Sequence, residues 1–162
     1  MEIRNATMDD LQAIAAVEAA CFPATEAATA EEFAGRLAHY ADHFWLLFEQ
    51  GELVAFVDGF CTDWPDLTDE MYADASLHRE NGAWQMIFGV NTIPACRRQG
   101  YAGQLLQQAI ADARAQGRKG LVLTCKEALV HYYAKFGFVN EGVSGSTHGL
   151  SLIHISEPTR PI

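Results

Sequence analysis

Two arginines and two glycines stand together in the stretch CRRQGYAGQLLQQAI, residues 96–110, of a chain with an excess of acidic residues. The pattern predicts that Gly100 and Gly103 lie in the first turn of a helix. Such a turn presents unpaired backbone N–H groups and the positive end of the helix dipole, and glycine lets a ligand approach the main chain. The stretch is therefore predicted to hold an anion, although Arg97 and Arg98 could also be exposed charges at a helix start. Its spacing matches neither the dinucleotide fingerprint GxGxxG nor the P-loop.

Cysteine and histidine spacing argues against a metal. The cysteines lie far apart without a CxxC pair, so reduced, partly buried thiols are expected rather than a zinc ribbon or redox motif. His39 and His43 have i, i+4 spacing and could share a metal, but no third ligand is evident and the sequence predicts a helix end there. We expect no metal site.

The composition of the chain limits the kinds of molecule that it can bind. With 21 acidic and 11 basic residues the net charge is −10, which opposes binding to nucleic acid or an anionic membrane. The first residues, MEIRNATMDDLQ, are polar and acidic, and no apolar run is long enough to cross a bilayer. These features predict one compact, soluble, cytoplasmic domain, and they leave open whether it is a monomer or a homodimer.

The elements that must position residues 96–110 follow from local signals. Two capping boxes, Thr7 with Asp10 and Thr29 with Glu32, predict helices after a short strand at EIRNAT. FWLLFE and ELVAFVDGF, joined by Gln50-Gly51, predict a hairpin. The polar stretch 62–82 is long enough to be a functional loop.

The second half of the chain predicts a crossover. The apolar run AWQMIFGVNTI contains Gly89, which predicts a bulge or a close approach of another group to the backbone. A helix over 102–113 ends at Gly117 and is followed by the strand KGLVLTC, the short helix EALVHYYAKF and the strand GFVNEGVS. The order β-α-α-β-β-β-α-β-α-β, with strand–helix–strand over 83–125, predicts a mixed α/β sheet with a parallel pair.

The tail has two interpretations. LSLIHISEPTR, residues 150–160, resembles the translation of an adapter used in preparing sequencing libraries. We interpret residues 1–149 as the domain and 150–162 as a non-native tail replacing its last strand. The alternation in SLIHIS leaves open a genuine closing strand paired with residues 138–144.

Pro94 followed by Arg97-x-x-Gly100-x-Ala102 resembles the acetyl-coenzyme A (acetyl-CoA) pyrophosphate loop, (Q/R)xxGx(G/A), of the GNAT N-acetyltransferases. Four other stretches resemble the arylalkylamine (serotonin) N-acetyltransferase branch: CFP at 21–23, LVAFVDG at 53–59, LHRENG at 77–82 and CKEALVHYYAKFGF at 125–138. The resemblance spans residues 2–149. It implies the GNAT acyltransferase fold, with a mixed sheet splayed between its fourth and fifth strands, and acetyl transfer from acetyl-CoA to a primary amine.

The resemblance also implies where acetyl-CoA binds, namely where the strand at 83–93 splays from the strand at 119–125. Main-chain groups of Val90, Asn91 and Thr92 would pair with the pantetheine arm, and the Val90 N–H would meet the developing oxyanion. The diphosphate would be held by the main chain of Arg98, Gln99, Gly100, Tyr101, Ala102 and Gly103.

Acetyl transfer needs a proton donor for the departing thiolate and a base for the amine. An alkylamine with a pKa near ~10 loses its proton at neutral pH at a cost of roughly 4 kcal/mol. Tyr133 stands where the family keeps its general acid, and a neutral phenol suits that task. Its helical stripe with Leu129, Tyr132 and Phe136 is explained equally by core packing.

The chain differs from the serotonin enzymes at the residues that accept the proton of the amine. Met86 and Phe88 occupy the positions of two histidines that are thought to relay the amine proton in serotonin enzymes, and neither side chain accepts a proton. His78, Asp69 and Glu70 are candidate bases from the long loop, and His78 has the suitable intrinsic pKa. A water chain to a carboxylate is the other possibility.

The candidate substrate-binding residues are those that occupy the positions of the substrate pocket in related enzymes. Phe22 and Pro23 fall where related enzymes build the wall of an arylalkylamine pocket, and Phe88 and Trp84 could add aromatic surface. The acidic loop would attract an amine cation, although an ordinary solvated loop explains it too. We expect a small primary amine, aromatic or not; the alternatives are a CoA-binding sensor without catalysis and an acetyltransferase for a protein or peptide amine.

Overall fold

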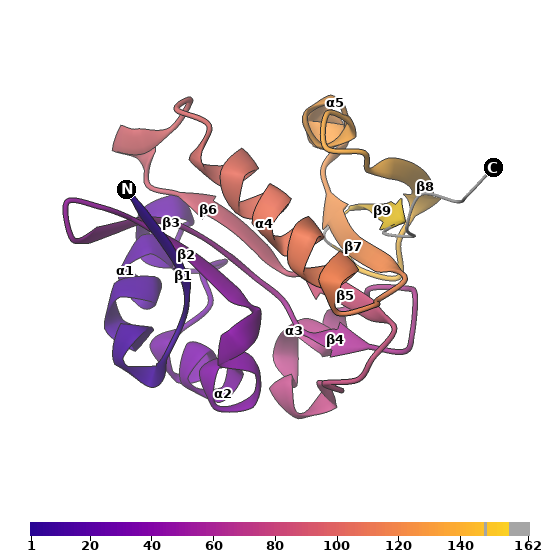
Figure 1. Cartoon of the computed structure of the whole chain (residues 1–162), viewed down its shortest axis with the longest axis horizontal. Coiled ribbons are helices and arrows are strands. Elements are labelled where there is room, and N and C mark those ends of the chain that lie inside the picture. The colour runs from indigo at the N-terminus through magenta and orange to yellow at the C-terminus, as the bar shows by residue number, and fades with distance from the viewer. Residues whose placement is uncertain (148, 156–162) are drawn as a thin grey trace. The chain divides into compact units, whose positions relative to one another are not determined.

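A computed structural model describes residues 1–147 and 149–155 (Figure 1). The chain divides into two compact units, one of residues 1–59 and 89–106 and one of residues 60–88 and 107–162. A four-stranded sheet belongs to the first unit and a five-stranded sheet to the second. Among the described helices, none has both the length and the apolar composition needed to cross a membrane.

The first unit contains an antiparallel sheet in the order β1-β2-β3-β6. Its strands are β1 (Glu2–Asn5), β2 (Phe44–Glu49), β3 (Glu52–Asp58) and β6 (Gly89–Thr92). The predicted hairpin is confirmed as β2–β3, and Gln50 and Gly51 in its turn have φ values of 50° and 80°. Positive φ at both positions is what a two-residue type I′ turn requires.

Two helices, α1 (Leu11–Cys21) and α2 (Ala30–Tyr40), pack against each other, and α1 also packs against β3 and β6 (Figure 1). Both capping boxes are confirmed: Thr7 caps the 3₁₀ turn η1 (Met8–Asp10) that leads into α1, and Thr29 caps α2. A second 3₁₀ turn, η2 (Ala41–His43), leads into β2. The core of this unit is aromatic, with Phe33 edge-on to Phe44 and Phe56 at centroid distances of 6.3 and 5.8 Å.

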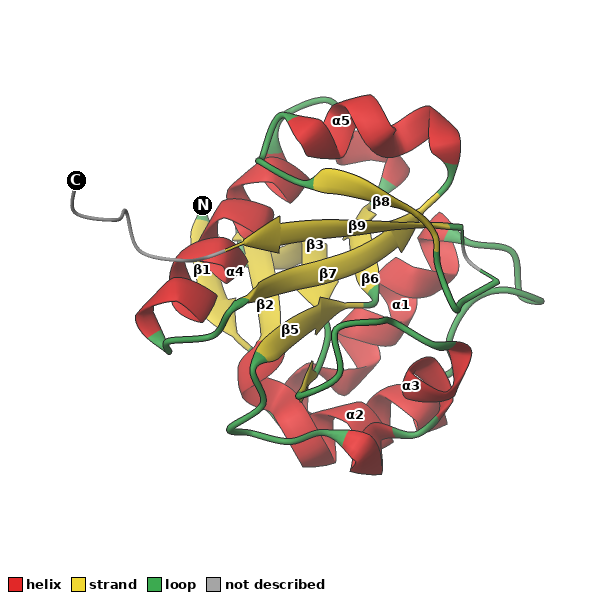
Figure 2. Cartoon of the chain, turned by 90° about the vertical axis from the view of Figure 1, so that its right-hand side faces the viewer, coloured by secondary structure: helices red, strands yellow, loops and turns green. Residues whose placement is uncertain are grey.

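The second unit contains a mixed sheet in the order β4-β5-β7-β9-β8 (Figure 2). Its strands are β4 (Cys61–Thr62), β5 (Trp84–Ile87), β7 (Gly120–Cys125), β8 (Val139–Val143) and β9 (Leu150–Ile155). β5 and β7 pair in parallel, which confirms the predicted crossover, and the other pairs are antiparallel. The mixed α/β fold class is therefore confirmed.

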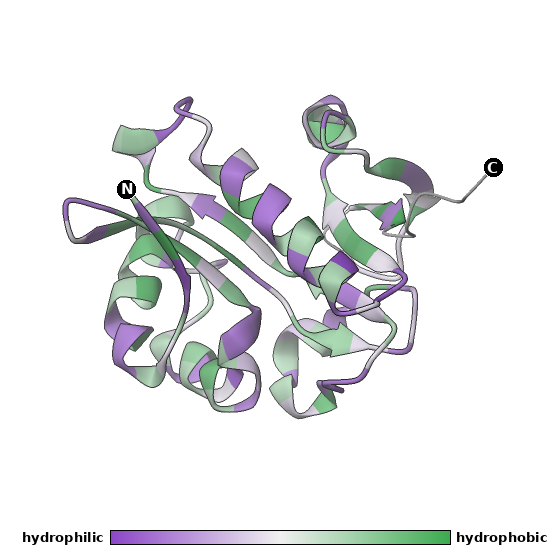
Figure 3. Ribbon diagram, in the orientation of Figure 1, coloured by the Kyte–Doolittle hydropathy of each residue, from purple (hydrophilic) through white to green (hydrophobic). Residues whose placement is uncertain are grey.

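The remaining helices connect these strands. They are α3 (Asp69–Ala73), η3 (Ala75–Leu77), η4 (Pro94–Cys96), α4 (Tyr101–Ala115), η5 (Glu127–Leu129) and α5 (Val130–Ala134). Hydrophilic and hydrophobic residues alternate along α4, as its periodicity predicted (Figure 3). The stretch 62–82, predicted as a loop, thus contains the short helices α3 and η3, because its local helix signals are only one turn long.

The predicted fourth strand, residues 83–93, is two strands in the structure. β5 pairs with β7 in the five-stranded sheet, whereas β6 pairs with β3 in the four-stranded sheet. The break falls at Phe88, directly before Gly89. A Cβ at Gly89 would lie 2.9 Å from Asp58 Oδ1, so the close approach predicted for this glycine is confirmed.

Residues Leu150–Ile155 of the tail form β9, between β7 and β8 in the sheet order. Val139 and Asn140 of β8 pair with Ile153 and Leu152, and the Leu152 side chain is fully buried. This is the closing-strand arrangement that the alternation of SLIHIS allowed. The origin of the tail in an adapter stays a prediction, and residues 156–162 lie outside the described residues.

Candidate active site

The predicted anion loop runs from η4 to the start of α4 in the first unit. Arg97, Arg98, Gln99 and Gly100 are exposed. Gly100 has a φ of 80°, and Arg98, which is not a glycine, has a φ of 67°. Left-handed backbone at a non-glycine residue is strained, and such strain is concentrated at functional sites.

The backbone N–H groups of residues 98–103 have no hydrogen-bond partner among the described residues. The first hydrogen bond of α4 is the one that the Gln104 N–H donates to the Gly100 carbonyl, at 3.1 Å. A Cβ at Gly100 would meet nothing within 4 Å, so the space beside this loop is open. Free N–H groups at the start of a long helix, beside open space, fit an anionic group such as a diphosphate.

β6 leads into this loop and is tied to it. The Thr92 carbonyl accepts hydrogen bonds from Arg97 Nε at 3.1 Å and from Cys21 Sγ at 3.3 Å. These contacts hold the end of β6, the start of the loop and the last residue of α1 together. Val90 is half-buried, and β6 pairs with β3 alone among the described strands, so its other edge has no strand partner there.

A buried polar cluster beside β6 was missed by the sequence analysis. Arg36 on α2 donates from Nη1 to Asp58 Oδ2 at 3.1 Å, and Asn91 on β6 donates from Nδ2 to Glu18 Oε1 at 2.8 Å. All four side chains are buried. Burial raises the pKa of Asp58 to about 6, against the lowering effect of Arg36. The available signal was an acid at the end of the apolar strand LVAFVD.

Tyr133 lies on α5 in the second unit, 7% exposed. Its ring is edge-on to Tyr132 at 5.1 Å and to Phe138 at 6.0 Å. Burial, followed by the nearby Tyr132, Cys125 and Tyr72, raises the pKa of the Tyr133 hydroxyl well above its ordinary value. The phenol therefore stays protonated across the physiological range and has a proton to donate.

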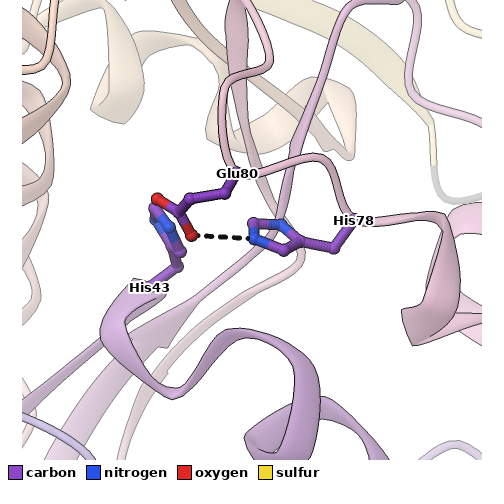
Figure 4. Close-up of side chains that lie close together, drawn as sticks. All are labelled: His43, His78 and Glu80. Carbon is purple, nitrogen blue, oxygen red and sulfur yellow. Dashed lines mark hydrogen bonds and ion pairs between the residues drawn. The ribbon is translucent and has the colours of Figure 1, made fainter.

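His78, the candidate base with the most suitable intrinsic pKa, is held through both ring nitrogens, and Figure 4 shows the contact of one of them with Glu80. Nδ1 accepts the Cys61 N–H at 3.0 Å, which puts the proton of the neutral ring on Nε2, and Nε2 lies 3.0 Å from Glu80 Oε1. In this arrangement neither nitrogen offers a free lone pair. Asp69 and Glu70, the other candidates, are exposed at the start of α3, and Asp69 accepts from Ser146 Oγ at 2.7 Å.

The expected substrate residues fall in both units. In the first unit, Phe22 follows α1, 39% exposed, and Pro23 is exposed beside it. In the second unit, Phe88 packs on Phe60 and Tyr72 at 5.0 and 4.8 Å. The second unit also has an open cavity of about 460 Å³, lined by Phe60, Thr62, Asp63, Trp64, Thr68, Glu70, Met71, Leu77 and Arg79. The lining thus combines two carboxylates and an exposed indole, which suit a cationic and partly apolar ligand, with one guanidinium, that of Arg79.

Residues 8–138 match the Acetyltransferase (GNAT) family, and the protein belongs to that family. The serotonin N-acetyltransferase of Mesocricetus auratus is 35% identical over 103 residues, which are 63% of this chain and 48% of the relative. The chain thus matches about half the length of that relative.

Solved structures share the fold. A GNAT-like decarboxylase, GphF, in complex with isobutyryl-CoA has a TM-score of 0.84 and 23% identity, with coverage of 97% of this chain and 100% of that one. A GNAT acetyltransferase from Brucella melitensis in complex with acetyl-CoA has a TM-score of 0.65 and 20% identity, with coverage of 99% and 90%. At these identities the likeness concerns the fold alone.

Proposed function

We propose that the protein transfers an acetyl group from acetyl-CoA to a primary amine. The observation that carries this proposal is the set of N–H groups over residues 98–103 that have no partner among the described residues, in the stretch that resembles the family's pyrophosphate loop. The fold neighbours in complex with acetyl-CoA and isobutyryl-CoA support a CoA thioester as the donor. In this proposal the main chain of Arg98, Gln99, Gly100, Tyr101, Ala102 and Gly103 holds the diphosphate.

The rest of the donor lies along β6. Main-chain groups of Val90, Asn91 and Thr92 pair with the pantetheine arm, and the Val90 N–H stabilises the oxyanion that forms when the amine adds to the acetyl carbonyl. Tyr133 protonates the departing sulfur. Its raised pKa keeps the phenol protonated at neutral pH, so that a proton is present at this position when the sulfur departs.

The acceptor in this proposal is a small primary amine. Support comes from the serotonin N-acetyltransferase relative and from the acidic and aromatic lining of the cavity in the second unit. Phe22 and Pro23 would contribute apolar surface in the first unit, and Phe88 in the second. If the acceptor is instead a protein or peptide amine, we expect negligible rates with small amines and acetylation of a peptide.

The second candidate is a CoA-binding sensor without catalysis, favoured by one observation. Met86, which stands at one of the histidine positions of the serotonin enzymes, is fully buried, and Phe88 stands at the other. Neither side chain can relay a proton. In the sensor, CoA binds but no amine releases the thiol.

The experiment is a thiol-release assay with acetyl-CoA and a panel of amines and peptides. Tyr133→Phe is compared with Tyr132→Phe, a matched control on the neighbouring and more exposed phenol. Loss of the general acid is expected to lower kcat by about 10²-fold while CoA affinity measured by calorimetry is unchanged, and the control keeps its rate. CoA binding without release by any acceptor would favour the sensor. No detectable CoA binding would overturn both readings.

A further inference from the structure

Asp58 is the last residue of β3, and its backbone pairs with Gly89 of β6. Gly89 directly precedes Val90, whose N–H is assigned to the oxyanion in the proposed function. The Asp58 side chain is 1% exposed. A buried carboxylate thus stands one residue away from the backbone group that would hold the reacting carbonyl.

This carboxylate is only half satisfied. Oδ2 accepts the hydrogen bond from Arg36, but Oδ1 is buried and has no partner among the described residues. Asn91 in the same cluster repeats the pattern, since its Nδ2 is bonded to Glu18 while its Oδ1 is buried and unpartnered. Buried acceptors without a donor are costly and rare. Two of them in one cluster point to donors that the protein does not supply, such as ordered water.

Gly89 lies directly against Asp58 Oδ1 and leaves no room there for a side chain. A Cβ at this position would lie 2.9 Å from Oδ1 and 3.3 Å from Asn91 Nδ2. The φ of Gly89 is not among the positive values, so its backbone does not need glycine. The need for glycine is therefore spatial, and it concerns the same carboxylate oxygen that has no partner.

We propose that Asp58, through a water molecule bound at Oδ1, accepts the proton that the amine loses in the acetyl transfer. The inference rests on the proposed function and supplies the base that Met86 and Phe88 cannot provide. The sequence allowed a water chain to a carboxylate as the base, and this inference identifies that carboxylate as Asp58. His78, with both ring nitrogens bonded, keeps a structural role in this scheme.

The amine loses two protons in the reaction: one goes to Asp58, and the other replaces the proton that Tyr133 gives to the sulfur. The ammonium gives one proton to the bound water, which gives one of its own to Asp58 Oδ1. The neutral nitrogen attacks the acetyl carbon, a C–N bond forms, and the C–S bond breaks with its electron pair on sulfur. Tyr133 protonates the sulfur and is restored by the second proton that leaves nitrogen. Amide, thiol and protonated Asp58 result, and Asp58 returns its proton to solvent.

The groups facing Asp58 set its basicity. Arg36 on α2 stabilises the carboxylate, whereas burial and the Glu18 carboxylate on α1 oppose ionisation, so that its pKa is about 6. Tyr40 on α2, whose own pKa burial raises well above its ordinary value, stays neutral. At neutral pH Asp58 is therefore ionised and ready to accept a proton, with a basicity closer to that of an imidazole than of an ordinary carboxylate.

The test is the pH dependence of kcat/KM with acetyl-CoA and the best amine of the panel. The unmodified protein is expected to show an acidic limb with a midpoint near pH 6, because protonated Asp58 cannot accept. Asp58→Asn is expected to lower kcat/KM about 10²-fold and to remove this limb. Asp10→Asn is the matched control, because Asp10 is also buried and arginine-paired, but with both oxygens engaged. Asp10→Asn is expected to keep both the kcat/KM of the unmodified protein and the acidic limb of its pH profile.

Gly89→Ala keeps the inference testable if Asp58→Asn, which leaves Arg36 without its carboxylate, does not fold. The added methyl group would lie 2.9 Å from Oδ1 and displace whatever is bound there, while Arg36 keeps a carboxylate as its partner. Turnover is expected to fall about tenfold or more, while the melting curve and the CoA affinity stay near those of the unmodified protein. Normal turnover in Gly89→Ala, or an unchanged acidic limb in folded Asp58→Asn, overturns the role of Asp58 and leaves the transferase intact. Absence of turnover in the unmodified protein overturns both.

Discussion

Gly100→Ala isolates the contribution of the anion loop, because the chain contains a matched control. Gly100 and Gly51 both have a φ of 80°, and a Cβ would meet nothing within 4 Å at either position. Alanine in this left-handed region costs about 1 kcal/mol at each site. The two variants should therefore lose similar stability, a melting temperature lower by roughly 2–4 °C for a chain of this length.

The two variants should differ in CoA affinity. We expect the strain of alanine at residue 100 to be relieved by a rotation of the loop that turns its N–H groups away from the diphosphate of the proposed complex, and each hydrogen bond to a charged group contributes about 1.5–3 kcal/mol. Loss of one such bond corresponds to a rise in Kd of roughly 10- to 150-fold. Gly51 lies in the β2–β3 turn, so Gly51→Ala should change Kd by less than about twofold, since surface changes away from a site are nearly neutral.

Calorimetric titration of both variants with CoA measures this difference, with thermal melts to confirm equal stability. S-acetylpantetheine, which lacks the diphosphate, serves as a second acetyl donor, and its kcat/KM should be the same for Gly100→Ala and Gly51→Ala. Equal CoA affinities in the two variants would refute the assignment of the diphosphate to this loop. Equal losses with both donors would show that the alanine acts through general distortion.

Three further outcomes are expected. The Arg4 guanidinium donates hydrogen bonds to both carboxylate oxygens of Asp10 and lowers the pKa of Asp10. The pair therefore stabilises the fold at neutral pH, and this contribution is lost as the pH falls through the lowered pKa. Urea titrations should show that Asp10→Asn is less stable than the unmodified protein at pH 7 and that the difference shrinks in acid. Leu152→Ala should lower the free energy of unfolding by about 2–5 kcal/mol, whereas Ile155→Ala, 50% exposed, should change it little; equal small effects would argue against β9 as part of the core. Replacing residues 150–162 by an authentic terminal strand should raise the melting temperature if the tail is adapter-derived, and an unchanged or lower value would contradict that interpretation.

The predictions that held depend on neighbouring residues. Thr7 and Thr29 cap helices because their hydroxyls reach N–H groups two or three residues ahead, and Gln50-Gly51 forms a turn through its own φ values. The exposed loop before α4 is of the same kind, since Gly100 and the helix start that frees its N–H groups lie within a few residues of each other. Local spacing can determine such features because no distant partner takes part in them.

Features that depend on distant partners were decided by the tertiary structure. The strand predicted over 83–93 is divided because β5 and β6 pair with different neighbours, a choice that no pattern within those residues contains. His78 accepts the Cys61 N–H at Nδ1 and donates from Nε2 to Glu80 only once the stretch that follows β4 has folded back on Cys61.

Asp58 shows the same limit most clearly. In the sequence it is one acid at the end of an apolar strand, and an exposed strand end would leave it an ordinary carboxylate. Packing of α1 and α2 on the sheet buries it against Arg36, raises its pKa to about 6 and leaves one oxygen without a donor among the described residues. The sequence by itself determined the family, the two capped helices, the β2–β3 turn and the glycine-containing start of α4. Which carboxylate becomes basic depends on burial and on charges from other elements, and those exist only once the chain has folded.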